Sequence, residues 1–445
     1  MVGTARFELA TPCTPSKCAT RLRYVPTELA AEVEQRRVST IKFYTRRQLR
    51  ARTRSCIDED PRRQGLTSVT NKRDDCHHRA SASCGIMISI EKLGLWNHAR
   101  FFLAILVSGG AGYIGGHAAR ALRRSGYEVV LYDSLTTGFR CLAQGFELVE
   151  GDIADETALR PVLARVDAVM HFAAHAYVGE SVENPRKYFQ NNVVAALSLL
   201  NCAVDAGIRR FVFSSTCAVY GIPEQIPITE LTPREPVNPY GASKLFFENA
   251  LEAYSRAYGL RSVSLRYFNA AGADDSGEIG ELHDPETHLI PLALAASTED
   301  GPELQIFGSD YPTPDGTCVR DYIHVNDLAE AHVRALQYLE TQQLAESAHE
   351  KGGDPLAINL GTGRGHSVFE VIRAAENATG RPVRRKIVPR RPGDPPILVA
   401  DPAKAQRVLG WTAHRNLADI VSSAGKWMQK NSKNEKAVTA ASPCV

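Results

Sequence analysis

A tyrosine and a lysine four residues apart are the first candidates for acid–base chemistry in this chain. Tyr240 and Lys244 stand at the start of a helical stretch that reaches Tyr258, so both side chains project from one face of the predicted helix. A phenol with a pKa of about 10 is a poor base at neutral pH, and a lysine ammonium one turn away stabilises the phenolate. Tyr240 is therefore a candidate proton acceptor; the alternative is an ordinary exposed pair after the helix-start residues Asn238 and Pro239.

A cluster of hydroxyl groups precedes this pair at a predicted strand end. Ser214, Ser215 and Thr216 follow the apolar run Phe211–Phe213, and Thr216 precedes Tyr240 by 24 residues. In parallel sheets, ligands bind beyond the carboxyl ends of the strands. The cluster therefore favours the catalytic interpretation of Tyr240.

A glycine-rich turn connects a predicted strand to a predicted helix. The apolar run Leu103–Val107 leads to Gly109, Gly112 and Gly115. These glycines permit a tight turn, let the backbone approach a pyrophosphate and allow the helix to pack closely on the strand. The N-terminus of that helix offers free N–H groups and a partial positive charge to phosphates. The pattern predicts a dinucleotide-binding unit.

An acidic residue ends the next predicted strand. The run Glu128–Tyr132 leads into Asp133, which lies 18 residues past Gly115. A carboxylate at this place accepts a hydrogen bond from a ribose 2′-hydroxyl and repels a 2′-phosphate. The predicted cofactor is therefore NAD and not NADP.

Further strand-like runs alternate with helical stretches along the chain. This alternation predicts an α/β fold, a doubly wound parallel sheet of the Rossmann type with a smaller, interleaved C-terminal substrate-binding part. Asp152 and Ile153 lie just beyond one of these runs and are expected near the adenine. The runs are residues 146–149, 168–172, 210–214 and 262–267.

Residues 103–427 resemble the extended short-chain dehydrogenase/reductase family and, within it, the UDP-glucose 4-epimerases. The resemblance follows the family's order of motifs. Beyond the glycine turn and the tyrosine–lysine pair, the matching segments are HFAAHAYVGES (171–181), FSSTCAVYG (213–221), NPYGASK (238–244), LRYFNAAGA (265–273), DGTCVRDYIHVNDLA (315–329), NLGTG (359–363) and PRRPGD (389–394).

The resemblance implies a reaction for the paired residues. Tyr240 would remove the proton from the sugar 4-hydroxyl as hydride passes from C4 to NAD, and Thr216 would hydrogen-bond the same oxygen. Lys244 would hold the nicotinamide ribose and lower the pKa of Tyr240. The 4-keto sugar would then turn and take the hydride back on its other face, so that NAD stays bound. The expected protein is a cytoplasmic isomerase that acts on a UDP-sugar.

The resemblance also implies binding residues. Asn269 is expected at the UDP phosphates, and Arg320 and Arg391 at the diphosphate and uridine, because a planar guanidinium suits bidentate contact with phosphate. Phe307 is expected near the uracil and Asp394 near the uridine ribose. The implied cofactor-binding residues are Gly109, Gly112, Tyr113, Ile114, Gly115, Asp133, Asp152, Ile153, Phe172, Ala173, Asn191, Ser214, Tyr240, Lys244 and Tyr267. The implied substrate-binding residues are Thr216, Tyr240, Asn269, His288, Phe307, Arg320, Arg391 and Asp394.

Some of these residues have other interpretations. Arg320 could instead pair with its neighbours Asp321 or Asp327. His288 and His324 invite a metal interpretation, but no third ligand is spaced with them and this chemistry needs no metal. We therefore expect no metal ion.

Two positions depart from the family pattern and leave the preferred sugar open. Ala176 stands where many UDP-glucose 4-epimerases have a lysine near the nicotinamide, and Leu398 stands where others have tyrosine or cysteine beside the sugar. A tyrosine there is associated with exclusion of N-acetyl sugars, and leucine is intermediate in bulk. UDP-N-acetylglucosamine is an alternative substrate. UDP-xylose and UDP-arabinose are others, because several motifs also resemble their 4-epimerases.

Two other classes of function fit the residues less well. A nucleotide-sugar 4,6-dehydratase needs acids beside the threonine, typically Thr-Asp-Glu, whereas Cys217 and Ala218 follow Thr216 here. A non-catalytic NAD-binding module would be expected to lose Tyr240 or Lys244, and both are present.

Charge and helix pattern indicate the partners. Residues 1–100 hold 19 Lys and Arg against 10 Asp and Glu (+9), and residues 101–445 hold 33 against 40 (−7), so the net charge of +2 sums two unlike segments. No nucleic-acid or membrane partner is expected. The stretches Asn184–Ala206 and Pro239–Tyr258 pair between subunits in the family, which implies a homodimer.

Residues 1–102 are expected to lie outside the working protein, either disordered or spurious. Residues 1–26 resemble the peptide obtained when a transfer-RNA gene is translated, and the segment shows no sustained helical or alternating period. A zinc site or a basic nucleic-acid-binding arm is an alternative, but neither matches spacings of the CxxC type. The ligands of that zinc site would be Cys76, His77, His78 and Cys84. The expected divisions are 103–268 for NAD binding, 269–429 mainly for UDP-sugar binding and 430–445 for a frayed tail.

Overall fold

The computed structural model describes residues 103–346, 355–391 and 393–438. The expectations for residues 1–102, including the zinc site and the basic arm, lie outside these residues. The last helix, α12 (Leu417–Val438), continues past Lys430, where the sequence predicts a frayed tail to begin. Within the described ranges, no helix is both long enough and apolar enough to cross a membrane.

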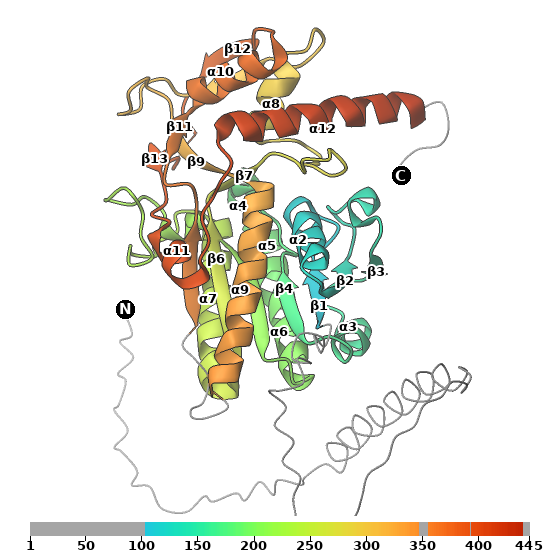
Figure 1. Ribbon diagram of the computed structural model, residues 1–445. Coiled ribbons are helices and arrows are strands. Elements are labelled where there is room, and N and C mark those ends of the chain that lie inside the picture. The colour runs from blue at the N-terminus through green and yellow to red at the C-terminus, as the bar shows by residue number, and fades with distance from the viewer. Residues whose placement is uncertain (1–102, 347–354, 392, 439–445) are drawn as a thin grey trace, which may run out of the picture. The chain divides into compact units, whose positions relative to one another are not determined.

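A seven-stranded sheet forms the larger part of the molecule, in the order β10-β6-β5-β4-β1-β2-β3 (Figure 1). Every neighbouring pair is parallel. From the inner strand β1, successive strands are added outward first on one side and then on the other, which is the doubly wound arrangement of a Rossmann fold. The predicted fold class is confirmed. The strands are β1 (Ala104–Ser108), β2 (Glu128–Asp133), β3 (Glu147–Glu150), β4 (Ala168–His171), β5 (Arg210–Thr216), β6 (Arg261–Tyr267) and β10 (Leu356–Leu360).

Helices cover both faces of this sheet. Along β1, Ile105 and Val107 join the hydrophobic cluster under α2, α9 and α11, whereas Leu106 joins the cluster under α3, α6 and α7. Alternate side chains of a strand point to opposite faces, so both faces of β1 are buried, as a parallel sheet requires. The helices are α2 (Tyr113–Arg124), α3 (Glu156–Leu163), α6 (Ala196–Asp205), α7 (Pro239–Tyr258), α9 (Val325–Glu346) and α11 (Ala403–Leu409).

A smaller part is built from short strands and three helices. Strand β9 (Val319–His324) pairs with β7 (Asn269–Ala271), β11 (Gly365–Ser367) and β13 (Ile397–Leu398). A second cluster of helices and strands contains α8 (Leu289–Ala296), α10 (Val368–Thr379), α12 and the pair formed by β8 (Leu304–Phe307) and β12 (Arg385–Val388). Because α9 and β10 return to the large sheet, the two parts interleave along the chain. The remaining elements are η3 (Arg140–Ala143), α4 (Val178–Glu183), α5 (Pro185–Phe189), the π-helical turn η4 (Gln190–Ala195) and η5 (Cys217–Tyr220).

Candidate active site

The glycine turn follows β1 and leads into α2. Gly109 has a φ of +74°, and a Cβ atom there would lie 2.5 Å from the backbone nitrogen of Ala173. A Cβ at Gly115 would lie 2.2 Å from the carbonyl oxygen of Gly109. Neither position accepts a side chain without backbone movement, so the turn and the first turn of α2 are packed backbone against backbone.

The N-terminus of α2 fits a pyrophosphate. Gly112 precedes the helix, and within the described residues no side chain caps its first N–H groups. Those groups and the helix dipole favour an anion at this place. The side chains of Tyr113 and Ile114 serve the protein itself, since the Tyr113 hydroxyl donates to the Gly272 carbonyl at 2.7 Å and Ile114 packs on the cluster under α2. The two residues can therefore offer only their backbone to a phosphate.

Asp133 stands at the end of β2 beside this turn. Its carboxylate is buried and accepts hydrogen bonds from the backbone nitrogens of Ala111 at 2.9 Å and Leu135 at 2.8 Å. Burial raises the pKa of Asp133, although these two hydrogen bonds oppose the rise. Each carboxylate oxygen keeps a second lone pair, so the group can still accept from a ribose hydroxyl. The turn, the helix end and this carboxylate together fit an NAD molecule.

The neighbouring strand ends carry the other predicted cofactor residues. Phe172 and Ala173 follow β4 and donate their N–H groups to the Ser108 carbonyl at 2.8 and 3.1 Å, which fixes this strand end against the glycine turn. Asp152 and Ile153 follow β3; Asp152 is exposed, whereas Ile153 is buried beneath the sheet. Of these two, only Asp152 has a side chain open to a ligand.

Helix α7 brings Tyr240 and Lys244 to the end of β5. Asn238 caps the helix by accepting from the Gly241 nitrogen at 2.8 Å, and a proline occupies its first position, so the helix begins immediately before Tyr240. The exposed fractions of Tyr240 and Lys244 are 9% and 3%, which excludes an ordinary exposed pair. The Lys244 ammonium donates to the Ser214 carbonyl at 2.7 Å and lies 6.0 Å from the centre of the Tyr240 ring.

Burial favours the neutral form of both groups. It raises the pKa of Tyr240 well above the ordinary value, and a hydrogen bond with Thr216 opposes this rise. It lowers the pKa of Lys244 to about 7, and the nearby carboxylate of Glu248 opposes that fall. A phenolate at Tyr240 therefore needs additional positive charge beside it, which a nicotinamide ring would provide.

Further predicted residues gather at the adjacent ends of β5 and β6. Thr216 and Tyr267 are partners in the register of these strands. The Ser214 hydroxyl and the Tyr267 hydroxyl are hydrogen-bonded to each other. Thr216 is buried, and its hydroxyl oxygen accepts from the Ala218 nitrogen at 3.2 Å. The structure thus brings Ser214, Thr216 and Tyr267 together with the tyrosine–lysine pair.

A buried ion pair one turn beyond Lys244 was not identified from the sequence. Glu248 accepts hydrogen bonds from Arg266 at 2.9 and 2.6 Å and from the Ser215 hydroxyl at 2.5 Å. Both charged side chains are 3% exposed. Glu248 favours the ammonium form of Lys244, so this ion pair acts on the charge of the tyrosine–lysine pair. The spacing of four residues that links Tyr240 to Lys244 also links Lys244 to Glu248, and this pattern could have found it.

Two adjacent asparagines lie in η4 beside α7. The side-chain oxygen of Asn192 accepts from the His175 nitrogen at 2.9 Å, and its amide donates to the His175 carbonyl at 2.9 Å and to the Ser243 hydroxyl at 3.1 Å. The predicted residue, Asn191, is half-buried and donates to the Asn192 oxygen at 2.9 Å. Asn192 therefore ties the segment after β4 to α7, and nothing in the sequence distinguishes it from its neighbour.

Four predicted substrate-binding residues meet as two pairs. The Arg320 guanidinium donates to the Asp394 carboxylate at 2.6 Å, and the Arg391 guanidinium lies 3.8 Å from the centre of the Phe307 ring. These residues come from β8, β9 and the segment after β12, so the pairs join distant parts of the chain. Each pair places a cation where an anionic ligand can reach it, since Arg320 is 13% exposed and Arg391 is exposed.

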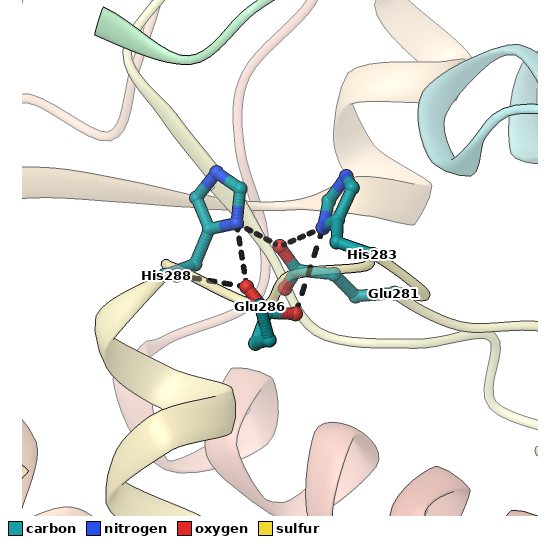
Figure 2. A group of neighbouring side chains, drawn as sticks. All are labelled: Glu281, His283, Glu286 and His288. Atoms are coloured by element: carbon teal, nitrogen blue, oxygen red, sulfur yellow. Dashed lines mark hydrogen bonds and ion pairs between the residues drawn. The ribbon is translucent and has the colours of Figure 1, made fainter. Parts of the chain in front are cut away.

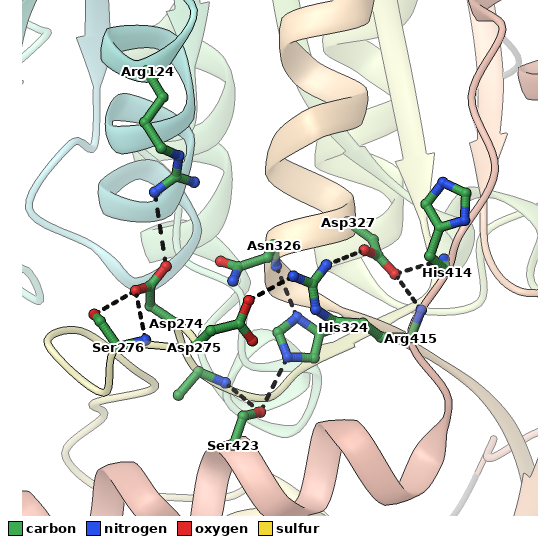
Figure 3. A network of polar contacts seen from close by, with 11 residues as sticks. Arg124, Asp274, Asp275, Ser276, His324, Asn326, Asp327, His414, Arg415 and Ser423 are labelled. Carbon is green, nitrogen blue, oxygen red and sulfur yellow. Dashed lines mark hydrogen bonds and ion pairs between the residues drawn. The ribbon is translucent and has the colours of Figure 1, made fainter.

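The alternative ion pairs for Arg320 are not formed. Asp321 accepts instead from the Thr362 hydroxyl at 2.6 Å, and Asp327 pairs with Arg415 at 2.5 Å (Figure 3). His324 lies in the same network, where its ring contacts the Ser423 hydroxyl at 3.1 Å. The carboxylates nearest Arg320 in sequence thus have other structural roles.

The two histidines that invited a metal interpretation lie in different surroundings. His288 directly precedes α8, and its Nδ1 atom lies 2.9 Å from carboxylate oxygens of both Glu281 and Glu286. Burial alone would lower the pKa of His288, but these carboxylates raise it to about 10. Burial lowers the pKa of His324 to about 4. Asn269, the remaining predicted substrate residue, opens β7 opposite Tyr322 of β9.

The two positions that depart from the family pattern also differ in surroundings. Leu398 lies on β13 and packs against a cluster that contains Cys217, Tyr220 and Phe268, beside the end of β5. Ala176 is exposed in the segment after β4. Leu398 is therefore the one of the two whose side chain borders the end of β5.

Comparison with known proteins gives concordant matches. The family model described as NAD dependent epimerase/dehydratase family matches residues 105–347. A UDP-glucose 4-epimerase of Rhizobium leguminosarum bv. trifolii is 48% identical over 332 residues, which are 74% of this chain and 98% of that protein. The structure of UDP-glucose 4-epimerase from Brucella ovis in complex with NAD is similar with a TM-score of 0.68 and 48% identity, and covers 73% of this chain and 97% of that one. The enzyme from Bifidobacterium longum, in complex with NAD+ and UDP, has a TM-score of 0.68 and 39% identity over 74% and 99% of the two chains.

Proposed function

Because the chain belongs to the NAD dependent epimerase/dehydratase family, we propose that it is a UDP-glucose 4-epimerase, which interconverts UDP-glucose and UDP-galactose and so serves galactose metabolism. The observation that carries the proposal is the buried pair of Tyr240 and Lys244 at the end of β5. A buried phenol that a neighbouring ammonium helps to ionise can take a proton from a ligand oxygen and return it.

In this proposal each residue has a defined task. Tyr240 takes the proton from the sugar 4-hydroxyl and later returns it, and Thr216 holds the same oxygen by a hydrogen bond. Lys244 binds the nicotinamide ribose and, in the ammonium form that Glu248 favours, stabilises the phenolate. Bound NAD supplies a hydride acceptor for C4 and the same hydride for the return step. Asp133 fixes the adenosine ribose.

The substrate side would bind UDP through its two arginine pairs. Arg320 and Arg391 present guanidinium groups to the diphosphate, and Phe307 offers a ring to the uracil. When UDP binds, Asp394 would give up part of its contact with Arg320 and contact the uridine ribose. The Bifidobacterium longum complex with UDP supports a uridine site in this fold.

The residues beside Thr216 argue against 4,6-dehydration. Cys217 and Ala218 occupy the positions where elimination needs acids. Burial raises the pKa of the Cys217 thiol to about 12, so this side chain is a poor proton donor at neutral pH. The sugar therefore keeps its 6-hydroxyl in the proposed reaction.

We also propose that the enzyme is a cytoplasmic homodimer. Large hydrophobic side chains are exposed on α5, η4 and α7, the helices expected to pair between subunits. Burying them against a second copy would remove apolar area from water. The cytoplasmic location is supported by free thiols such as that of Cys202, because a reducing compartment keeps cysteines from forming disulfides. Light scattering should show a dimer for the wild type, and the Phe246→Glu variant should contain a larger fraction of monomer. The exposed side chains are Phe189, Val194, Phe246 and Tyr258.

The test of the function uses purified protein without added NAD. It is incubated separately with UDP-galactose, UDP-xylose and UDP-N-acetylgalactosamine, and the products are separated by chromatography. We expect UDP-galactose to be converted to UDP-glucose, and the other two reactions measure how far Leu398 admits different sugars. Inactivity on all three would refute the proposal.

A further inference from the structure

The loop between β7 and α8 gathers four side chains that are typical metal ligands. Glu281, His283, Glu286 and His288 converge from an eight-residue segment, and their carboxylate and imidazole groups face one another (Figure 2). The sequence argument against a metal pairs His288 with His324. The structure gives His288 three other neighbours within its own loop.

The distances among the four groups match a small coordination sphere. The Nδ1 atom of His288 lies 2.9 Å from oxygens of Glu281 and Glu286, and the Nδ1 atom of His283 lies 3.3 and 3.5 Å from the same two carboxylates. All four ligand atoms lie within 4.8 Å of one another. A tetrahedral zinc ion with ligands at about 2.1 Å places its ligand atoms about 3.4 Å apart, close to these separations.

Two of these groups have buried atoms whose bonding is incomplete. The Glu281 side chain is 4% exposed, and within the described residues its Oε2 atom has no hydrogen-bond partner. The Nδ1 atom of His283 is buried and likewise makes only the longer ion-pair contacts. A buried carboxylate with an oxygen that lacks a partner costs free energy, and a cation bound by the Glu281 carboxylate would offset that cost.

We propose that Glu281, His283, Glu286 and His288 bind one zinc ion. When the ion binds, the two imidazoles release their protons to solvent, and two carboxylates with two neutral imidazoles make a set with charge −2, which a divalent ion balances. The nitrogen and oxygen donors suit zinc, whereas magnesium and calcium prefer oxygen donors alone.

The zinc ion has a structural role, because all four positions of its tetrahedron are filled by protein side chains. It joins the two ends of the segment Glu281–His288, so it fixes the start of α8, before which His288 lies. The Glu281 carbonyl also accepts from the Trp427 indole of α12 at 3.0 Å. The ion therefore holds this loop in place between α8 and α12. The zinc site is separate from the proton-transfer pair at Tyr240.

The first test measures zinc in the full-length protein, purified without a histidine tag. The protein is stripped with a chelator, titrated with Zn²⁺ and freed of excess metal by gel filtration. We expect one zinc per chain, with a Kd on the order of 0.1 µM. A hundredfold excess over Kd should raise the Tm by about 4 °C. Less than a tenth of an equivalent of bound zinc would overturn the proposal.

Matched variants locate the ion. The double variant Glu281→Gln, Glu286→Gln should lose the zinc and the Tm increase, whereas Glu278→Gln, an exposed carboxylate in the same loop, should keep both. The double variant Cys76→Ser, Cys84→Ser should also keep the zinc. Loss of zinc from the cysteine variant, or its retention by the Glu281, Glu286 variant, would place the ion elsewhere and refute the proposal.

Cobalt substitution provides a readout that does not depend on any variant folding. Co²⁺ in the stripped wild-type protein should give the visible absorption of a tetrahedral ion without the intense near-ultraviolet band of thiolate ligation. An octahedral spectrum would contradict the proposed tetrahedral geometry. A thiolate band would contradict the proposed ligands, which are carboxylates and imidazoles such as that of His283.

Discussion

On the side of the site formed by α7 and the large sheet, Tyr240 and Lys244 lie among rings and carbonyl groups, whereas on the substrate side His288 and Arg320 each have a carboxylate in direct contact. Lys244 lies against a carbonyl and the Phe213 ring, and burial lowers its pKa to about 7. His288 contacts two carboxylates, and its pKa rises to about 10 although it too is buried. Arg320 is likewise paired with Asp394.

This difference separates two kinds of chemistry. Groups buried without a full counter-charge are shifted toward their neutral form, and such groups can exchange a proton with a ligand. A guanidinium buried beside a carboxylate, as Arg320 is beside Asp394, stays ionised and can act as a fixed charge for binding. We therefore expect substitutions on the first side to change kcat and those on the second side to change KM.

The largest expected effect comes from Tyr240→Phe. Without the phenol, no group in contact with the sugar oxygen can take its proton, so kcat should fall about 10³-fold with little change in KM. Tyr188→Phe is the matched control, because Tyr188 is buried 6.4 Å from the Tyr240 ring and bonds the Tyr177 carbonyl and Glu180. Steady-state kinetics should show a loss below tenfold for the control. Full activity of Tyr240→Phe would show that Tyr240 is not the base.

A smaller effect is expected on the substrate side from Arg391→Ala. Removing a charge-assisted contact to the diphosphate should raise KM roughly 10- to 100-fold and leave kcat nearly unchanged. Arg390→Ala is the control, since the adjacent Arg390 pairs with Asp310 and lies over the Tyr311 ring. An equal rise in KM for both variants would show that Arg391 acts only through general surface charge.

The smallest expected effect concerns pH and a neutral histidine. His332 lies beside the Phe172 and Tyr267 rings, and burial lowers its pKa to about 4. The unfolded chain binds this proton from about pH 6.5 downward, whereas the folded protein binds it only near pH 4. Stability is therefore lost as the pH falls through this window.

His332→Met should make this loss smaller. Between pH 7 and pH 5, the Tm of the variant should fall about 2–3 °C less than that of the wild type, corresponding to about 2 kcal/mol. Thermal unfolding of both proteins at several pH values measures this difference, and parallel curves for wild type and His332→Met would contradict the prediction.

The features that the sequence predicts correctly are local ones. The glycine turn between β1 and α2, the position of Asp133 at the end of β2 and the alternation of strands and helices depend on residues near one another in the chain. The same holds for the spacing of Tyr240 and Lys244, whose burial follows from a helix that packs on the sheet. Periodicity and short motifs report such features directly.

The features that the sequence does not predict depend on contacts between distant segments or on a choice between neighbours. Arg320 has two acidic neighbours in sequence, yet it pairs with Asp394, 74 residues away. Asn191 and Asn192 are the same residue type, and the course of η4 decides which of the two side chains points inward. No periodicity encodes these choices, because they are fixed by how loops and sheets pack.

The central claim is that the sugar is oxidised and reduced at C4 within one active site, with Tyr240 handling only the hydroxyl proton. The direct measurement is the conversion of UDP-galactose to UDP-glucose in deuterium oxide, followed by mass spectrometry and proton NMR of the product. We predict no deuterium on any sugar carbon, because the hydrogen removed from C4 returns to C4 without exchange with solvent. Deuterium at C4 or C5 would contradict the account.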